Sequence, residues 1–301
     1  MEPLIRALAG APGLSGWAKW MATSADRAAK DALQFFCHAF GYLEPRAQTK
    51  VLRRLRSADG SNVDGLLHEL LMFDVCRRFG LCPEFEPQSG AKTPDLRLSI
   101  GDRIYFADVF VTSRPVKTRI TFQGSEGYKD SGEAAKKMAD ALALKAARYA
   151  KLSAPVLVFV VLGGHDVGHL DLEIALYGSA IGEIAAAGGL KVRCHKDWHT
   201  HGVFCPPGPE ARHRNVSAVV SCDWFASLAR TGRRLHCVVY HHWNPDVVLP
   251  LGSFGRFPDV HFDQNSKGHF VPSVTGIPNL VMSTSPGNET KWAPYSANRP
   301  W

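Results

Sequence analysis

Three acidic residues interrupt apolar segments of the chain: Glu69 in "HELLMFDVC", Asp95 in "TPDLRLSI" and Asp108 in "RIYFADVFV". A lone carboxylate buried among apolar side chains is costly unless it is paired, protonated or bound to a metal ion. Three carboxylates on neighbouring elements can together hold a divalent cation, and hard oxygen ligands suit Mg²⁺ or Mn²⁺. Such an ion orients a water, lowers its pKa and neutralises charge on a phosphodiester. The sequence therefore predicts that Glu69, Asp95 and Asp108 form a metal site.

Each acid also has an ordinary structural interpretation, and these alternatives stay open at this point. Glu69 could cap a neighbouring loop or pair with Arg77 or Arg78. Asp95 could be a turn residue after a proline, and Asp108 a buried acid that is hydrogen-bonded to the backbone. The occurrence of all three acids around one predicted strand hairpin favours the metal site.

One α/β unit accounts for the positions of these acids. Glu69 lies on a predicted helix, and the aspartates lie on two strands joined by a Gly-Asp turn, a dipeptide typical of hairpins. A second helix then leads to an apolar strand. The order helix, strand, strand, strand, helix, strand predicts a mixed sheet flanked by helices. The segments in chain order are 63–79, a short strand in "CPEFEP", 95–100, 103–111, 132–152 and 156–162.

The remaining segments suggest additions to this unit. Helices are predicted within 24–57, a turn and boundary in "ADGSN" at 58–62, a helix over 171–188, and strands at 216–221 and 235–242. Gly, Pro, Ser and Asn are frequent beyond about residue 250, which is typical of irregular structure. We therefore expect an N-terminal helical extension (1–60), an α/β domain with C-terminal elaborations (61–250) and an irregular tail (251–301).

The stretch "HELL…TPDLRLSIGDRIYFADVFV" resembles the PD-(D/E)XK nuclease superfamily, whose restriction-endonuclease-like core has the order α-β-β-β-α-β. Pro94 and Asp95 match the "PD", and Asp108 matches the second acid, 13 residues on. Glu69 matches the helical acid that precedes them. The resemblance covers about residues 62–165 and implies a Mg²⁺- or Mn²⁺-dependent hydrolase of phosphodiester bonds with Glu69, Asp95 and Asp108 as metal ligands.

The chain departs from the superfamily at the lysine that belongs two residues after the second acid, because that position is Phe110. Lys145 is the best replacement: it lies on an apolar stripe of the helix 132–152, and a desolvated lysine near carboxylates can orient or activate a water. Lys92 and Lys117 are the other candidates. The alternative for Lys145 is that its stem packs while its ammonium reaches solvent.

A second possible metal site lies in "RCHKDWHTHGVFC", where Cys194, His195, His199, His201 and Cys205 are all zinc-ligand types. Their spacing matches no standard zinc finger. A His-rich loop that touches substrate is the favoured interpretation, with structural zinc as the alternative.

Composition restricts the partners and the compartment. The chain has 301 residues and a formal net charge of +7, which is compatible with a polyanionic partner such as DNA or RNA. Its seven scattered cysteines indicate a reducing cytoplasm rather than a disulfide framework. The sequence lacks the pattern of a signal peptide and any apolar run long enough for a membrane span.

Together these features predict a metal-dependent endonuclease, most simply a DNA nuclease of bacterial defence or mobile elements, with Glu69, Asp95, Asp108 and Lys145 as catalytic residues. The alternative is an inactive nuclease-fold module that binds nucleic acid or a protein partner, because Phe110 replaces the lysine. A homodimer is one option for the assembly.

Overall fold

A computed structural model provides the structure of the chain, and the elements below belong to its described part. The described residues are 2–12, 14, 16–57, 60–87, 93–112, 131–152, 154–162, 169–177, 180–184, 192–196, 202–204, 212–223, 234–264, 270–276, 280–283 and 291–294. The helices are α1 (Glu2–Ala9), α2 (Gly16–Thr23), α3 (Arg27–Gly41), α4 (Pro45–Ser57), α5 (Gly60–Arg78), α6 (Ser131–Arg148) and α7 (His169–Tyr177). The strands are β1 (Glu84–Phe85), β2 (Leu96–Ile100), β3 (Arg103–Val111), β4 (Val156–Val161), β5 (Ala180–Ile184), β6 (Val192–Lys196), β7 (Val216–Asp223), β8 (Arg234–His241), β9 (Asp259–Gln264), β10 (Phe270–Thr275), β11 (Leu280–Ser283) and β12 (Lys291–Pro294).

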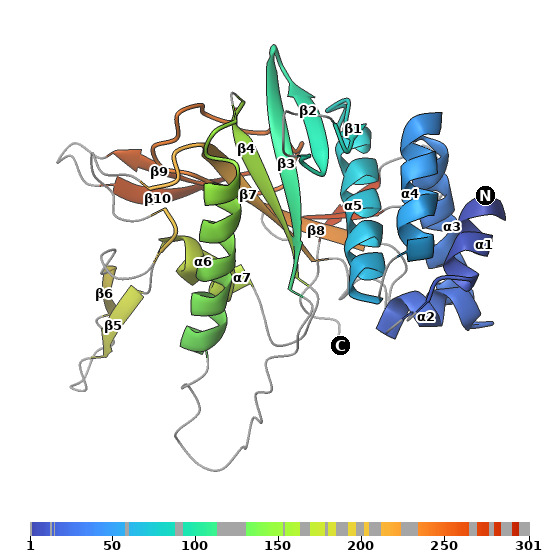
Figure 1. The fold of residues 1–301 in the computed structure, drawn as a ribbon. Coiled ribbons are helices and arrows are strands. Elements are labelled where there is room, and N and C mark those ends of the chain that lie inside the picture. The colour runs from blue at the N-terminus through green and yellow to red at the C-terminus, as the bar shows by residue number, and fades with distance from the viewer. Residues whose placement is uncertain are drawn as a thin grey trace.

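A mixed sheet forms the centre of the molecule, with helices on both of its faces (Figure 1). Its main path is β1-β2-β3-β4-β7-β8-β11-β12, and β9 and β10 join it through β8. The β2–β3 pair is an antiparallel hairpin, whereas β3–β4 and β4–β7 are parallel. Gly101 at the hairpin turn has a φ of +61°, a conformation that glycine adopts without a steric penalty. The predicted α/β class is therefore confirmed.

The central strand β4 is buried along its whole length, as expected of a parallel strand covered on both sides. Side chains at 157, 159 and 161 join the core with α5, while those at 156, 158 and 160 join the core with α6 and α7. Figure 1 shows α5 on one side of β3 and β4, and α6 on the other. The predicted order of elements from residue 63 to residue 162 is observed as α5, β1, β2, β3, α6 and β4.

The N-terminal helices share one core with the sheet. Leu4 on α1, Phe36 on α3 and Val51 on α4 are fully buried and belong to the cluster that also contains Leu70 of α5 and Val220 of β7. The predicted turn at 58–62 is too long, because α5 already begins at Gly60. The first 57 residues therefore cover the α5 side of the fold.

Two predictions about the later part of the chain are wrong. The helix predicted over 171–188 ends at Tyr177, and β5 follows it at 180–184. The C-terminal region is not irregular throughout, since β9 to β12 pair within the sheet. Short strands separated by Gly and Pro carry little periodicity, which is why composition alone favoured irregular structure.

The region after residue 250 is also fixed by side chains. Phe254 and Phe257 are buried, and both rings contact Phe79 at the end of α5. His241 Nε2 lies 2.7 Å from Asp259 Oδ1, and the Gly252 N–H donates to Asp259 Oδ2 at 3.0 Å. These contacts join β9 to the end of β8. Among the helices of the described residues, none is both long and apolar enough to cross a membrane.

Candidate active site

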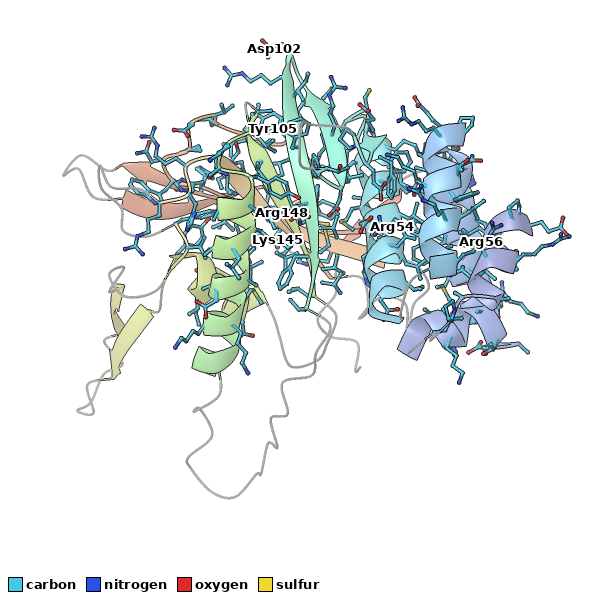
Figure 2. All side chains as sticks on the ribbon, in the orientation of Figure 1. Arg54, Arg56, Asp102, Tyr105, Lys145 and Arg148 are labelled. Carbon is cyan, nitrogen blue, oxygen red and sulfur yellow. The ribbon has the colours of Figure 1, made fainter. Side chains whose placement is uncertain are left out.

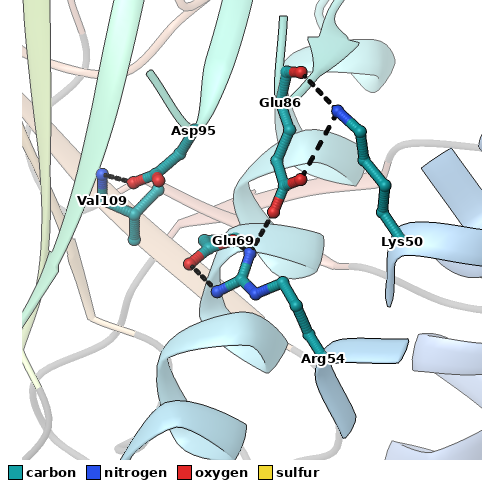
Figure 3. Close-up of polar contacts among 6 residues, drawn as sticks. All are labelled: Lys50, Arg54, Glu69, Glu86, Asp95 and Val109. Atoms are coloured by element: carbon teal, nitrogen blue, oxygen red, sulfur yellow. Dashed lines mark hydrogen bonds and ion pairs between the residues drawn. The ribbon is translucent and has the colours of Figure 1, made fainter. Parts of the chain in front are cut away.

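The hairpin brings the two predicted aspartates together. Leu96 pairs with Ala107, so Asp95, directly before β2, lies opposite Asp108 on β3. The Val109 N–H donates a hydrogen bond of 2.7 Å to Asp95 Oδ2, which fixes the Asp95 carboxyl against β3 (Figure 3). The Asp95 carboxyl also interacts with Asp108, and this interaction raises the pKa of Asp95. Two neighbouring carboxyl groups cannot both stay ionised without a proton or a cation between them.

The environment of Asp95 retains that proton. Burial raises the pKa of Asp95 to about 9, with further contributions from the hydrogen bond to Asp108 and from the charges of Glu69 and Asp108. The hydrogen bond from the Val109 N–H opposes this shift. The pKa of Asp95 therefore lies above neutral pH, which favours the protonated carboxyl at pH 7.

Lys145 supplies a cation to the same pair from the opposite layer. Its Nζ donates to Asp108 Oδ2 at 2.7 Å and to the Val109 carbonyl at 3.3 Å. The Asp108 side chain is 3% exposed and that of Lys145 is 21% exposed, so the ion pair is largely desolvated. Lys145 belongs to α6, next to β3 and β4 (Figure 2). Its ammonium therefore points into the site rather than to solvent.

The Lys145 ammonium also lies beside Phe110. Its Nζ is 5.9 Å from the centre of the Phe110 ring, within the range of a cation–π contact. Lys145 is 37 residues after Asp108 in the chain. Its position on α6 nevertheless brings a positive charge close to position 110 on β3. The other candidates, Lys92 and Lys117, lie outside the described residues.

Glu69 lies near the aspartates but is held by an arginine that the sequence analysis did not select. Arg54 of α4 binds both carboxylate oxygens, with distances of 2.6 Å from Nη1 to Oε2 and 2.9 Å from Nη2 to Oε1 (Figure 3). Burial raises the pKa of Glu69, the Arg54 contacts lower it, and the charges of Glu86 and Asp108 raise it. The influence of Asp108 shows that the two acids belong to one electrostatic cluster.

Glu86 completes the link between α4 and the acids. It forms an ion pair with Arg54, and Lys50 Nζ lies 3.6 Å from its Oε2 and donates to its carbonyl at 3.0 Å. Glu86 has a φ of +45°, a conformation that costs a non-glycine residue free energy. The contacts with Lys50 and Arg54 hold the residue in that conformation.

The alternative partners proposed for Glu69 are wrong, because both arginines serve another acid. Arg77 Nη2 and Arg78 Nε lie 2.8 Å and 2.6 Å from the fully buried Asp74. All three residues lie on α5, one turn apart, so a local ion-pair cluster satisfies them. Glu69 is thus left to Arg54, a residue of a different helix.

The charges of this cluster show how a metal ion would fit. The carboxyl groups of Glu69, Glu86, Asp95 and Asp108 face three cations, Lys50, Arg54 and Lys145. When Asp95 is protonated, the three remaining carboxylates balance the three cations, so the cluster is neutral. A divalent ion could take the place of the Asp95 proton.

The donor set fits such an ion only in part. Asp95 and Asp108 offer adjacent hard oxygen ligands, whereas both oxygens of Glu69 are bound to Arg54. In the described part of the chain, no three His, Cys, Asp or Glu side chains form a ready group of metal ligands. Ligation by Glu69 would therefore require its separation from Arg54.

Tyr149 is a further member of the cluster. It is 1% exposed, and its hydroxyl has no hydrogen-bond partner among the described residues. Burial raises its pKa, followed by the negative charge of Asp108, and the charges of Asp95 and Glu69 act in the same direction. The sequence places Tyr149 on the apolar stripe of Lys145, but no local signal indicates that the acids influence its hydroxyl.

We expect the Asp95 proton to make stability depend on pH. A folded-state pKa of about 9, above the usual 3.8, means that the folded chain retains a proton that the unfolded chain has lost. Its stabilising effect is full below about pH 4 and is lost as the pH rises towards 9, by about 1.4 kcal/mol per pH unit. Urea unfolding between about pH 6 and 8 should show this slope, and Asp95→Asn should remove it.

The exposed Asp102, in the turn of the same hairpin, provides the matched control. Asp102→Asn should leave the slope unchanged. An equal slope in the wild type and in Asp95→Asn would contradict the shared proton. Saturating Mg²⁺ should also flatten the wild-type slope, because a bound divalent ion displaces the proton.

The predicted Cys/His site cannot be compared with this cluster. The backbone of β6 includes Cys194 and His195, but the side chains of this strand, together with His199, His201 and Cys205, lie outside what the structure describes.

In comparisons with protein families, curated proteins and solved structures, nothing matches this chain. The candidate site therefore depends on its own geometry.

Proposed function

We propose that the protein is a metal-dependent nuclease of the PD-(D/E)XK type that hydrolyses phosphodiester bonds, with DNA as its substrate. The observation that carries this proposal is the convergence of Asp95, Asp108 and Lys145 from three elements onto one buried point. The element order from α5 to β4, which agrees with a restriction-endonuclease-like core, supports it.

Each residue has a distinct role in the proposed reaction. Asp95 and Asp108 would hold Mg²⁺ or Mn²⁺, joined by Glu69 once Arg54 releases it. When bound, the ion supplies a more acidic water and neutralises charge on the phosphate. Lys145 orients the attacking water between Asp108 and the phosphate. The Tyr149 hydroxyl would donate a hydrogen bond to an oxygen of the substrate.

The burial of these groups suits hydrolysis of a phosphodiester. The water attacks phosphorus, one P–O bond breaks, and the leaving oxygen takes up a proton. A preorganised cation in a site of low polarity stabilises the charge that develops on the phosphate oxygens without reorganisation. Lys145 meets this condition because Asp108 and the Val109 carbonyl fix its position.

The test is cleavage of a supercoiled plasmid by the wild type and by Asp108→Asn, with Mg²⁺, with Mn²⁺ and with EDTA. We expect the wild type alone to convert plasmid to nicked and linear forms, and only with a metal ion. Equal cleavage by both proteins would indicate a contaminating nuclease. Absence of cleavage by the wild type under all conditions would reject the proposal.

A second function is favoured by Phe110. A half-buried phenylalanine occupies the position of the motif lysine and packs against the α6 core, as expected in a module that has lost its chemistry. Such a module would bind DNA in the plasmid experiment without cleaving it. The Lys145–Asp108 contact favours the nuclease, because a module without chemistry has no need of a buried cation at this point.

A further inference from the structure

Two cysteines face each other across neighbouring strands of the sheet. Cys222 of β7 and Cys237 of β8 are direct partners in the antiparallel register. The Cα atoms of directly opposed residues in such a pair are about 4.5 or 5.5 Å apart, and disulfides span Cα distances of about 4.4 to 6.8 Å. The two backbones therefore lie within the range that a disulfide bond requires.

The side chains of this pair also point towards each other. The Sγ atoms of Cys222 and Cys237 are 3.1 Å apart. A disulfide bond is about 2.05 Å long, so the sulfur atoms need to approach each other by only about 1 Å. Because the register already sets the backbone distance, rotation of the side chains can close this gap without a shift of the strands.

Sulfur atoms of α5 lie next to the pair. The Sγ atom of Cys222 is 3.6 Å from the Sδ atom of Met72. Burial raises the pKa of the Cys76 thiol, and Cys222 and Asp74 raise it further. Cys76 therefore retains its proton, whereas the thiolate is the reactive form of a cysteine. The strand register and the short Sγ–Sγ distance thus favour Cys237 over Cys76 as the partner of Cys222.

We propose that Cys222 and Cys237 form a redox-sensitive site, at which a peroxide converts the two thiols into a disulfide that links β7 to β8. Hydrogen peroxide suits this site because it is small and uncharged, and the two cysteines are only 0% and 1% exposed. The site goes beyond the proposed nuclease activity and does not depend on it.

The reaction proceeds in two steps. The first sulfur attacks an oxygen of the peroxide, the O–O bond breaks, and a sulfenic acid and a water form. The second sulfur then attacks the sulfenic sulfur, the S–O bond breaks, and the oxygen leaves as a second water with the proton of the second thiol. Two electrons thus pass from the sulfur atoms to the peroxide, which is the only oxidant that the reaction needs.

The disulfide should make the fold harder to unfold. Cys222 and Cys237 are 15 residues apart in the chain, so a bond between them closes a loop and restricts the unfolded state. We expect the oxidised protein to reach half-unfolding at a urea concentration about 1 M higher than the reduced protein. Dithiothreitol should reverse this shift.

The test treats the folded, reduced full chain with hydrogen peroxide, blocks the remaining thiols and maps the tryptic peptides. Trypsin places the two cysteines on separate peptides, 215–230 and 235–256, so the disulfide joins them. The joined peptides should have a mass about 2 Da below the sum of the two, and dithiothreitol should separate them.

Two variants provide the controls. Cys237→Ala should give neither the joined peptides nor a higher urea midpoint after oxidation. Cys37→Ala removes a different buried cysteine and should give both, as the wild type does. Each variant is compared with its own reduced form, so a general loss of stability does not affect the result.

Several outcomes would overturn the proposal. One is a joined peptide that contains Cys76 in place of Cys237. Another is a bond that forms only in urea, because the folded chain would then not hold the two thiols in position. Joined peptides with an unchanged urea midpoint would show that the bond does not link the strands as proposed. These results hold whether or not the protein cleaves DNA.

Discussion

Lys145→Met is expected to lower the rate of plasmid cleavage by about 10²- to 10⁴-fold, the usual contribution of a positioned acid–base or water-orienting group. Methionine keeps most of the apolar stem but removes the ammonium that bonds to Asp108 and the Val109 carbonyl. The measurement is the single-turnover rate at saturating Mg²⁺. The control is Lys136→Met, which removes an exposed lysine from the same helix and should cleave at the wild-type rate.

A rescue experiment distinguishes a role in positioning water from a general loss of structure. Phe110 is half-buried, and its ring centre lies 5.9 Å from the Lys145 ammonium. A lysine at position 110 can therefore bring its charge to the same place. Phe110→Lys combined with Lys145→Met should recover at least tenfold of the lost rate. If Lys145→Met cleaves plasmid at the wild-type rate, Lys145 has no role in the proposed reaction.

Arg54→Met is expected to lower the free energy of unfolding by about 3 kcal/mol near neutral pH, because it leaves a buried carboxylate without its partner. Both oxygens of Glu69 bind this guanidinium, and the Glu69 side chain is only 10% exposed. Urea denaturation measures the loss. Arg56→Met, at an exposed position of the same helix, should change stability by less than about 0.5 kcal/mol.

Three further measurements connect this loss of stability to Glu69. Arg54→Met/Glu69→Gln should regain most of the stability, because it removes the unpaired charge as well as its partner. The deficit of Arg54→Met should shrink as the pH falls, since a carboxyl with a raised pKa takes up a proton more readily. Mg²⁺ should stabilise Arg54→Met more than the wild type if Glu69 is a metal ligand. If neither the Glu69→Gln substitution nor a lower pH restores the stability that Arg54→Met loses, the loss comes from packing rather than from the unpaired charge of Glu69.

The sequence predicts the hairpin and the Lys145 side of the site because their signals are local. Strand β3 has the predicted bounds, 103–111, since β-branched and aromatic residues fill it and a Gly-Asp turn precedes it. Lys145 stands out because a charge on an apolar helical stripe conflicts with the 3.6-residue period. Such conflicts are visible without knowledge of how the elements pack.

The Arg54 side of the site depends on packing between helices. Arg54 belongs to "VLRRLR", where each of three arginines could face solvent. Which of them enters the site is decided by Val51 and Leu55, whose burial turns Arg54 towards α5. The unpartnered hydroxyl of Tyr149 is likewise a property of the assembled site. Neither residue carries a signal in its own segment.

The contact between Arg54 and Glu69 has a consequence for modularity. A fragment that begins at α5 would lose Arg54 and Lys50, the counter-ions of Glu69 and Glu86, together with the apolar helices that cover one side of the sheet. Such a fragment could not be transplanted or exchanged as an independent unit. The helices before residue 58 and the acids after it therefore form one inseparable structural unit.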